Sequence, residues 1–221
     1  MKFGFKCFYT NIDTLNNKKA EFEARTVLMN PDIIGLSEIN PKNAKWKLTQ
    51  QDLQIKGYTM YENISGRGVV LYVREDIKSN LISVNDSGAV SVWCEIALRD
   101  GDRLLIGVVY RSPSTDREDN CLMMEMMSQM MSRKPSHILI MGDYNYPSID
   151  WIAQTAETEQ EQLFLDKFRD WFLWQHVDRP TRYRHGQSAN ILDLVMTNEE
   201  NMLDLVSICE PIGKSDHATL Q

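Results

Sequence analysis

The stretch Ile138-Leu139-Ile140-Met141-Gly142-Asp143-Tyr144-Asn145 joins a run of apolar residues to a polar end. The run predicts a strand, His137–Met141, that is buried on both faces, and the glycine marks its end. A rigid strand that ends in this way presents a carboxylate and an amide to a cleft. Residues two apart can face the same side of the chain, so Asp143 and Asn145 are expected to serve one site.

Working outward from this strand, four more polar groups lie beside buried strands. They are Asn11 and Asp13 after the first strand, Glu38 after Ile33–Ser37, Tyr110 and Arg111 after Leu104–Val109, and Asp193 within Ile191–Val195, with Ser215-Asp216-His217 near the C-terminus. An unpaired carboxylate inside an apolar strand costs several kcal/mol, so Asp193 is expected to have a partner. A structural salt bridge or a catalytic pair with His217 would provide one. Each motif alone is a weak signal, but all of them in this order make a strong one.

Short apolar segments separated by turns recur along the chain. Strands are expected at residues 3–9, 32–37, 68–74, 90–98, 104–110, 137–141, 191–197 and 205–208, and helices at 17–29, 119–133 and 159–174. The surplus of strands favours a mixed two-sheet sandwich with flanking helices. Two helical stripes are interpreted as core rather than ligand-binding residues. They are Met123, Met124, Met127, Met130 and Met131, and Phe164, Phe168, Trp171 and Phe172.

The composition is that of an ordinary globular protein, with 221 residues of which 43% are hydrophobic and 25% charged. This is enough for one large core, and a single domain over residues 1–221 is expected. The apolar run Leu104–Tyr110 is far shorter than the roughly 18 residues that span a bilayer, and no membrane partner is expected. The four cysteines are scattered without a CxxC pair, which favours reduced thiols in an intracellular protein.

The net charge of −7 argues at first against a nucleic-acid partner, because phosphate binding depends on Lys and Arg. A hydrolase that holds Mg²⁺ nevertheless needs several carboxylates in one place, and the bound cation reverses the local field. The negative charge therefore predicts a domain that binds DNA weakly and leaves much of the affinity to another module.

With these motifs in view, the chain resembles the endonuclease/exonuclease/phosphatase superfamily from Asn11 to His217, and within it the endonuclease domains of LINE-type (non-LTR) retrotransposons. The finer match rests on Gly66–Arg74, Val109–Ser114, Met141–Trp151, and Arg179–Arg182 followed by Leu192–Asn198. The resemblance implies an α/β (α+β) fold, a four-layered sandwich of two mixed β-sheets packed face to face with helices outside. It also implies Mg²⁺ dependence, with Mn²⁺ as a possible substitute, and phosphodiester hydrolysis.

The resemblance further implies that Glu38 is the principal metal ligand. Asn11, a catalytic residue, and Asp13 would lie nearby, and Asp216 would complete the carboxylate cluster. Mg²⁺ takes hard oxygen ligands and is often held by one or two carboxylates together with substrate phosphate. The proposed ligands are therefore of the right chemical kind.

The same resemblance assigns the remaining catalytic roles. Asp143 would position or deprotonate the attacking water, and Asn145 would orient the water and the phosphate. His217 would bind a non-bridging phosphate oxygen, with Asp193 fixing its tautomer and favouring the imidazolium. Tyr110 would lie near the phosphate or the leaving group.

Nucleic-acid contacts are expected from Arg111 and from the basic, aromatic loop Arg179–His185, above all from Thr181, Arg182 and Arg184. The alternative for the loop is a solvated charged surface. Repair enzymes that cut at abasic sites carry aromatic and basic residues just before the Asp that corresponds to Asp193. Here those positions are Ser188–Leu192, so no strong preference for abasic sites is expected.

The leading hypothesis is a DNA endonuclease that nicks one strand and leaves a 3′-hydroxyl for a reverse transcriptase of the same polyprotein. It would act in the nucleus, and the chain would be the N-terminal part of that polyprotein. Two alternatives remain at this point. One keeps the fold but changes the substrate to RNA or a phospholipid headgroup, and the other is a domesticated binding module without turnover.

Overall fold

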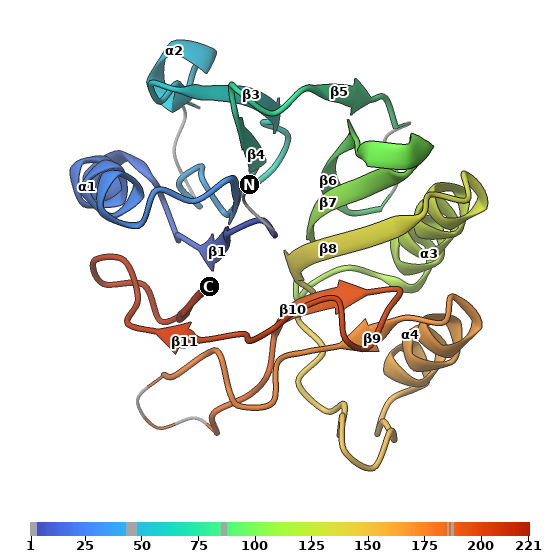
Figure 1. Cartoon of the computed structure of the whole chain (residues 1–221). Helices are drawn as coiled ribbons and strands as arrows, with labels where there is room; N and C mark the ends of the chain where they lie inside the picture. The colour runs from blue at the N-terminus through green and yellow to red at the C-terminus, as the bar shows by residue number, and fades with distance from the viewer. Residues whose placement is uncertain (1–3, 43–47, 85–87, 185, 187) are drawn as a thin grey trace.

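The chain folds into two mixed six-stranded β-sheets that pack face to face with helices on the outside, as Figure 1 shows. The computed structural model describes residues 4–42, 48–84, 88–184, 186 and 188–221. The first sheet has the order β11 (Ile208–Cys209), β12 (Thr219–Leu220), β1 (Cys7–Asn11), β2 (Ile33–Ser37), β4 (Val69–Arg74), β3 (Tyr58–Asn63). The second has the order β5 (Ser79–Ile82), β6 (Val90–Ala97), β7 (Arg103–Tyr110), β8 (His137–Asp143), β10 (Asp193–Thr197), β9 (Trp174–Gln175). This arrangement confirms the predicted sandwich.

Each sheet contains one parallel pair whose crossover is a helix on the outer face. α1 (Lys19–Met29) joins β1 to β2, and α3 (Arg117–Ser132) joins β7 to β8. α2 (Gln50–Leu53) and α4 (Glu159–Asp170) also lie outside the sheets. Because both strands of a parallel pair end at the same edge of a sheet, these crossovers bring distant polar strand ends together.

Strand register determines which of those polar residues become neighbours. In the second sheet Tyr110 pairs with Asp143 across the parallel β7–β8 ladder, and Asp143 pairs with Asp193 across the antiparallel β8–β10 ladder. In the first sheet Asn11 pairs with Ser37, immediately before Glu38. The polar residues at these strand ends therefore lie at one edge of the sandwich.

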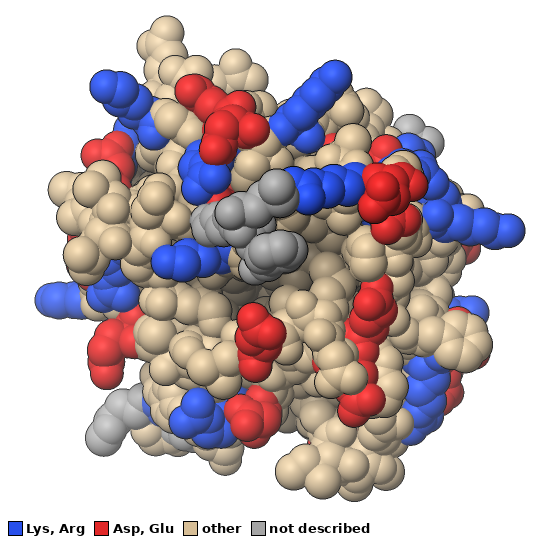
Figure 2. Space-filling view, viewed as in Figure 1, with Lys and Arg blue, Asp and Glu red and all other residues tan. Residues whose placement is uncertain are grey.

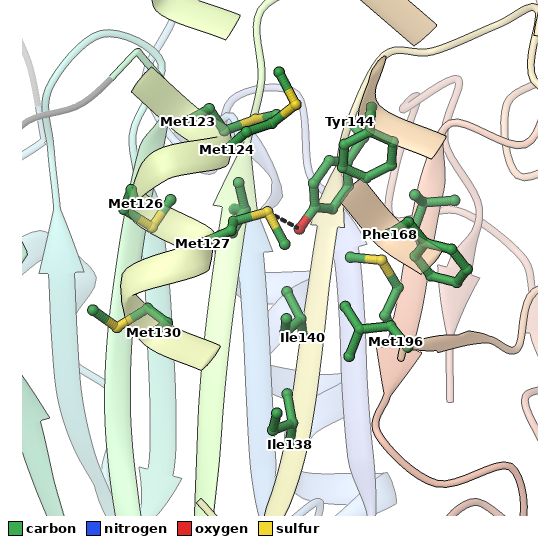
Figure 3. Packing of buried hydrophobic residues seen from close by; sticks show 14 of the residues in the cluster. Met123, Met124, Met126, Met127, Met130, Ile138, Ile140, Tyr144, Phe168 and Met196 are labelled. Carbon is green, nitrogen blue, oxygen red and sulfur yellow. Dashed lines mark hydrogen bonds between the residues drawn. The ribbon is translucent and has the colours of Figure 1, made fainter. Parts of the chain in front are cut away.

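The predicted methionine stripe of α3 is core. Met123, Met124, Met127 and Met130 are buried against the second sheet, and the hydroxyl of Tyr144 donates to Met127 Sδ at 3.8 Å (Figure 3). Met131 is half-buried and packs against the same cluster. Flexible thioethers fill irregular space between a helix and a twisted sheet, so this stripe needs no ligand to explain it.

Some element boundaries differ from those predicted from the sequence. The helix expected at 159–174 ends at Asp170, and Phe172, predicted to be buried, has a left-handed φ of 53° and is 82% exposed. The first strand begins at Cys7, after Gly4 with a φ of 111°, and the predicted start at residue 3 lies outside the described residues. The strand expected at 205–208 shrinks to Ile208–Cys209, with Leu205 exposed. Phe172 and Leu205 are apolar residues that the described part of the chain leaves exposed, so an apolar sequence alone did not make these positions part of a helix or strand.

A cavity of about 520 Å³ opens at the end of β1 away from Asn11. It is lined mostly by apolar residues of the segments 4–9, 202–207 and 220–221. Figure 2 shows one face of the molecule, on which acidic and basic side chains are interspersed around a hollow near the middle. Among the described helices, none combines the length and apolarity that a membrane crossing requires.

Candidate active site

The centre of the candidate site is a hydrogen bond that joins the two sheets. Asn11, the last residue of β1, donates from Nδ2 to Asp143 Oδ2 at 2.8 Å, and both residues are buried. Gly142 permits the close approach of β7 and β8, because a Cβ there would lie 2.1 Å from the Val109 carbonyl oxygen. The backbone N–H of Asn145 donates to Asp143 Oδ1 at 3.2 Å, so both carboxylate oxygens are held.

Asp193 and His217 form the second buried pair. His217 Nδ1 donates to Asp193 Oδ2 at 2.7 Å, although the residues are 24 positions apart. Its other ring nitrogen lies 4.0 Å from Asp143 Oδ2 and 3.8 Å from Asp216 Oδ1. The expected pairing is therefore present. His217 lies just before β12 rather than within a strand, held by a bridge to Arg182.

Burial and mutual charge perturb both titratable centres. Burial raises the pKa of Asp143 to about 7, His217 opposes the shift, and Asp193 and Glu38 add to it. Burial alone would lower the pKa of His217, but the negative charge of Asp193 and the hydrogen bond that His217 donates to it, together with the charges of Asp143 and Asp216, raise the pKa to about 10. At neutral pH the histidine is thus cationic, while Asp143 is poised between its two protonation states.

Glu38 lies beside this centre in a cluster with Arg67, Asp13 and Tyr110. Arg67 donates to Glu38 Oε2 from Nε at 3.0 Å and also from Nη2, which in addition donates to Asp13 Oδ1 at 2.6 Å. Burial raises the pKa of the Tyr110 hydroxyl well above its usual value, and the charge of Glu38 and a hydrogen bond with Glu38 raise it further. Tyr110 therefore stays neutral and retains its proton at any physiological pH.

The predicted metal ligands do not form one cluster among the described residues. Asp13 is bound to Arg67, and Asp216 is bound to Arg182 at 3.0 Å. The backbone N–H of Asp13 donates to Asn11 Oδ1 at 3.1 Å, and Asp13 itself has a left-handed φ of 41°. Among the predicted metal ligands, Glu38 is the one whose negative charge contributes to the raised pKa of Asp143.

Arg111 and Thr181, expected to contact nucleic acid, lie in the interior. Arg111 is 4% exposed, with its guanidinium 4.2 Å from the ring centre of Tyr146 and bonded to Asn120 and to backbone carbonyls. Thr181 Oγ1 accepts the N–H groups of Leu192 and Asp193 at 3.2 and 3.0 Å. These contacts favour a structural role for Arg111 and a role in holding Asp193 for Thr181.

The remaining predicted residues lie around the rim of the site. Asn145, with a left-handed φ of 49°, donates from Nδ2 to the Arg111 carbonyl at 2.8 Å. Arg182 is partly buried between Asp216 and the chain at His217, whereas Arg184 is exposed. His185 of the same loop lies outside the described residues. Arg184 is thus free to meet a backbone phosphate, while Arg182 would have to share its charge with Asp216.

The donor set fits a divalent cation. Asp143, Asp193 and His217 lie within 4.8 Å of one another, but the cationic His217 has no lone pair for a metal, so the carboxylates are the donors. Asp193 Oδ1 is buried without a hydrogen-bond partner in the described part of the chain. The raised pKa of Asp143 shows that its negative charge is under-compensated, and a cation would relieve this. Mg²⁺ prefers carboxylate oxygens, which Glu38 and Asp143 supply.

Sequence reasoning overlooked Arg67 and Tyr9. Arg67 lies in the turn Gly66-Arg67-Gly68 that begins β4, and β4 runs antiparallel to β2, so its start lies beside Glu38. The strand-end argument that identified Glu38 applies equally to Arg67. Tyr9 bonds to Ser37 at 2.8 Å, and burial raises the pKa of its hydroxyl well above the usual value, with Asp193 and Asp143 adding to the shift. Tyr9 looked like an ordinary core residue, and no local signal distinguishes it.

Several solved structures share the fold of this chain. The endonuclease domain of TRAS1, a telomere-specific non-LTR retrotransposon, superposes with a TM-score of 0.75 at 15% identity, over 98% of this chain and 96% of that one. The AP endonuclease LMAP from Leishmania major gives 0.74 at 12%, over 98% and 86%, and the 3′-5′ exonuclease NExo from Neisseria meningitidis gives 0.66 at 17%, over 97% of each chain. The fold is that of the endonuclease/exonuclease/phosphatase superfamily of nucleases and phosphodiesterases.

The sequence pattern of the "Endonuclease-reverse transcriptase" family matches residues 104–220, more than half of the chain. The chain belongs to this family. No curated protein sequence matches it.

Proposed function

We propose that this chain is a divalent-metal-dependent DNA endonuclease that hydrolyses one phosphodiester bond and leaves a 3′-hydroxyl. The observation that carries the proposal is the buried array Asn11–Asp143 and Asp193–His217, assembled from four chain segments at one edge of the sandwich. Burying three ionisable groups together costs free energy, and such an arrangement is typical of catalytic sites.

The side chains divide the chemistry between them. Asp143 is placed to position the attacking water and to accept a proton from it. The new bond joins the water oxygen to phosphorus, the bond from phosphorus to the 3′-oxygen breaks, and that oxygen takes up a proton from solvent water. The cationic His217 is placed to donate a hydrogen bond to a non-bridging oxygen and to stabilise the charge that accumulates there.

Glu38 is the residue proposed to hold the cation, Mg²⁺ or Mn²⁺, with the substrate phosphate completing its ligands. When bound, the cation polarises the phosphate and offsets charge on the leaving oxygen. Tyr110 keeps its proton and forms a hydrogen bond with Glu38, so it helps to hold that carboxylate in place. Asn145 and Asn11 restrain Asp143 from two directions.

The proposed partner is a reverse transcriptase domain of the same polyprotein, acting in the nucleus. The name of the matched family supports this pairing. A nick that ends in a 3′-hydroxyl supplies the primer terminus that a polymerase needs. In this proposal the partner domain supplies much of the DNA affinity, which is consistent with the net charge of −7 on this chain.

The test is nicking of supercoiled plasmid by the purified chain, with Mg²⁺ or with EDTA, for wild type and Glu38→Ala. We expect wild type to convert supercoiled to open-circular DNA only with the cation, and the nicked end to be extended by an added polymerase. Glu38→Ala should fall below about a tenth of wild-type activity, because loss of a main ligand costs several kcal/mol of transition-state stabilisation.

Glu95→Gln is the matched control, since Glu95 lies on β6 and pairs with Arg103 at 3.2 Å, away from the site. It should nick as wild type does. A chain that binds plasmid but never nicks it would instead be a binding module. Cleavage of RNA or of a phospholipid headgroup in preference to DNA would overturn the choice of substrate.

A further inference from the structure

Arg67 is bound directly to the proposed metal ligand, Glu38. Its Nε and Nη2 both donate to Glu38 Oε2, so two guanidinium nitrogens converge on one carboxylate oxygen. The side chains of Arg67 and Glu38 are only 14% and 17% exposed. A charge-assisted pair shielded in this way is stronger than a surface ion pair.

Arg67 is itself anchored without the help of Glu38. Nη1 donates to the carbonyl of Asn40 at 2.6 Å, and Nη2 also donates to Asp13 Oδ1. The backbone N–H of Asn40 donates back to the Arg67 carbonyl at 2.8 Å. Gly68, with a φ of 73°, permits this close approach, because a Cβ there would meet Ile39 Cγ1 at 2.7 Å. The guanidinium would therefore keep its place if Glu38 were changed.

The backbone of Glu38 is held in an unusual conformation. Its φ of 53° is left-handed, which is rare for a residue with a long side chain. Its carbonyl accepts the N–H of Thr14 at 2.7 Å, and the next residue, Ile39, donates to the Gly68 carbonyl. Such strain persists only where the surroundings over-determine it, and it clusters at functional sites.

We propose that Arg67 is a positioning residue that holds Glu38 through Oε2, so that the carboxylate keeps the orientation in which it binds the divalent cation. The proposal rests on the proposed metal-dependent function. The opposite role, in which the guanidinium competes with the cation for Glu38, would require Arg67 to move away. The anchors to Asn40 and Asp13 oppose such a movement. On this assignment Asp13 anchors Arg67 and is not itself a metal ligand.

The two roles predict opposite effects on metal affinity. A ligand that is held in place loses less side-chain freedom when the cation binds. Loss of a hydrogen-bonding partner behind a metal ligand typically weakens metal binding about 10- to 100-fold. Removing a competing cation would instead strengthen it. The sign of the change therefore decides between the roles.

The experiment measures Mn²⁺ binding by calorimetry and by the electron paramagnetic resonance of free Mn²⁺, with no DNA present. The variants are Arg67→Ala, Arg67→Lys, Glu38→Gln and the double variant Arg67→Ala/Glu38→Gln. We expect Arg67→Ala to bind Mn²⁺ about 10- to 100-fold more weakly. Lysine keeps the charge but not the two-pronged geometry, so Arg67→Lys should be intermediate. In the Glu38→Gln background, Arg67→Ala should add little further loss, because the arginine acts through that carboxylate.

Arg74→Ala is the matched structural control. Arg74 ends the same strand, β4, and pairs with the buried Asp32 at 2.6 Å, so its loss also removes a shielded ion pair. It should lower the free energy of unfolding without changing Mn²⁺ affinity. If Arg67→Ala does not fold, Arg67→Lys carries the test.

Unchanged or tighter Mn²⁺ binding by a folded Arg67 variant would overturn the proposal, as would fully additive losses in the double variant. These results differ from failure of the proposed function. If wild type and Glu38→Gln bind Mn²⁺ equally, or neither binds it, the metal site itself is misassigned. If Glu38→Gln loses binding while Arg67→Ala retains it, only the role of Arg67 is wrong.

Discussion

Replacing Asp143 with Asn should stabilise the metal-free protein at alkaline pH while abolishing nicking. Burial raises the pKa of Asp143 from 3.8 to about 7. The folded protein therefore keeps a proton that the unfolded chain releases, and stability falls as pH rises between those two values. Asparagine has no such proton, so its advantage over aspartate should increase with pH.

The magnitude follows from linkage. For a group with pKa values of 3.8 unfolded and about 7 folded, the stability lost between pH 5 and pH 8 is about 2–3 kcal/mol. The asparagine of the variant would also lose one of the two hydrogen bonds that Asp143 accepts, from Asn11 or from the N–H of Asn145, at a cost of about 1 kcal/mol. That cost is the same at both pH values, so the difference between them isolates the titration.

The assay is urea unfolding in EDTA at pH 5 and pH 8, followed by tryptophan fluorescence, for wild type and Asp143→Asn. Asp178→Asn serves as the control, because Asp178 is exposed and its pairing with Arg179 is solvated. The difference in unfolding free energy should shift toward the Asp143 variant by about 2–3 kcal/mol from pH 5 to pH 8, and not for the control. A pH-independent difference would refute the idea that buried negative charge at Asp143 strains the metal-free fold.

Three further outcomes are expected. His217→Ala and Asp193→Asn should each lose nicking activity, and the double variant should lose much less than the product of the single losses, because residues that act as a unit are not additive. Fully multiplicative losses in steady-state kinetics would show that the two residues act independently. Replacing Arg182 and Arg184 with Ala should weaken DNA binding across sequences and flatten its salt dependence in filter-binding assays, and an unchanged slope would leave the loop a solvated surface. Mn²⁺ at about ten times its Kd should raise the free energy of unfolding of wild type by about 1.4 kcal/mol in urea, and Glu38→Gln should show no such increase. An equal increase in both proteins would mean that the cation binds away from Glu38.

The sequence determined the sandwich and the order of its functional segments. Buried strands such as Leu104–Tyr110 and His137–Met141 carry a local signal, because short apolar runs that are rich in β-branched residues and end at polar or glycine residues favour buried strands. The polar residues at the ends of these strands can be recognised because they directly follow an apolar run. The burial of the α3 methionine stripe could also be predicted from the sequence, because its helical spacing places the methionines on one apolar face.

Only the tertiary structure decided how those residues divide into clusters. Register places Asp193 beside Asp143, and sheet-on-sheet packing brings Asn11 across to them. The same packing assigns Asp13 to Arg67 and Asp216 to Arg182, and takes Arg111 into the interior. A charged residue looks alike in sequence whether it meets DNA, a cation or another side chain. Its partner is set by pairings tens of residues away, which no local pattern encodes.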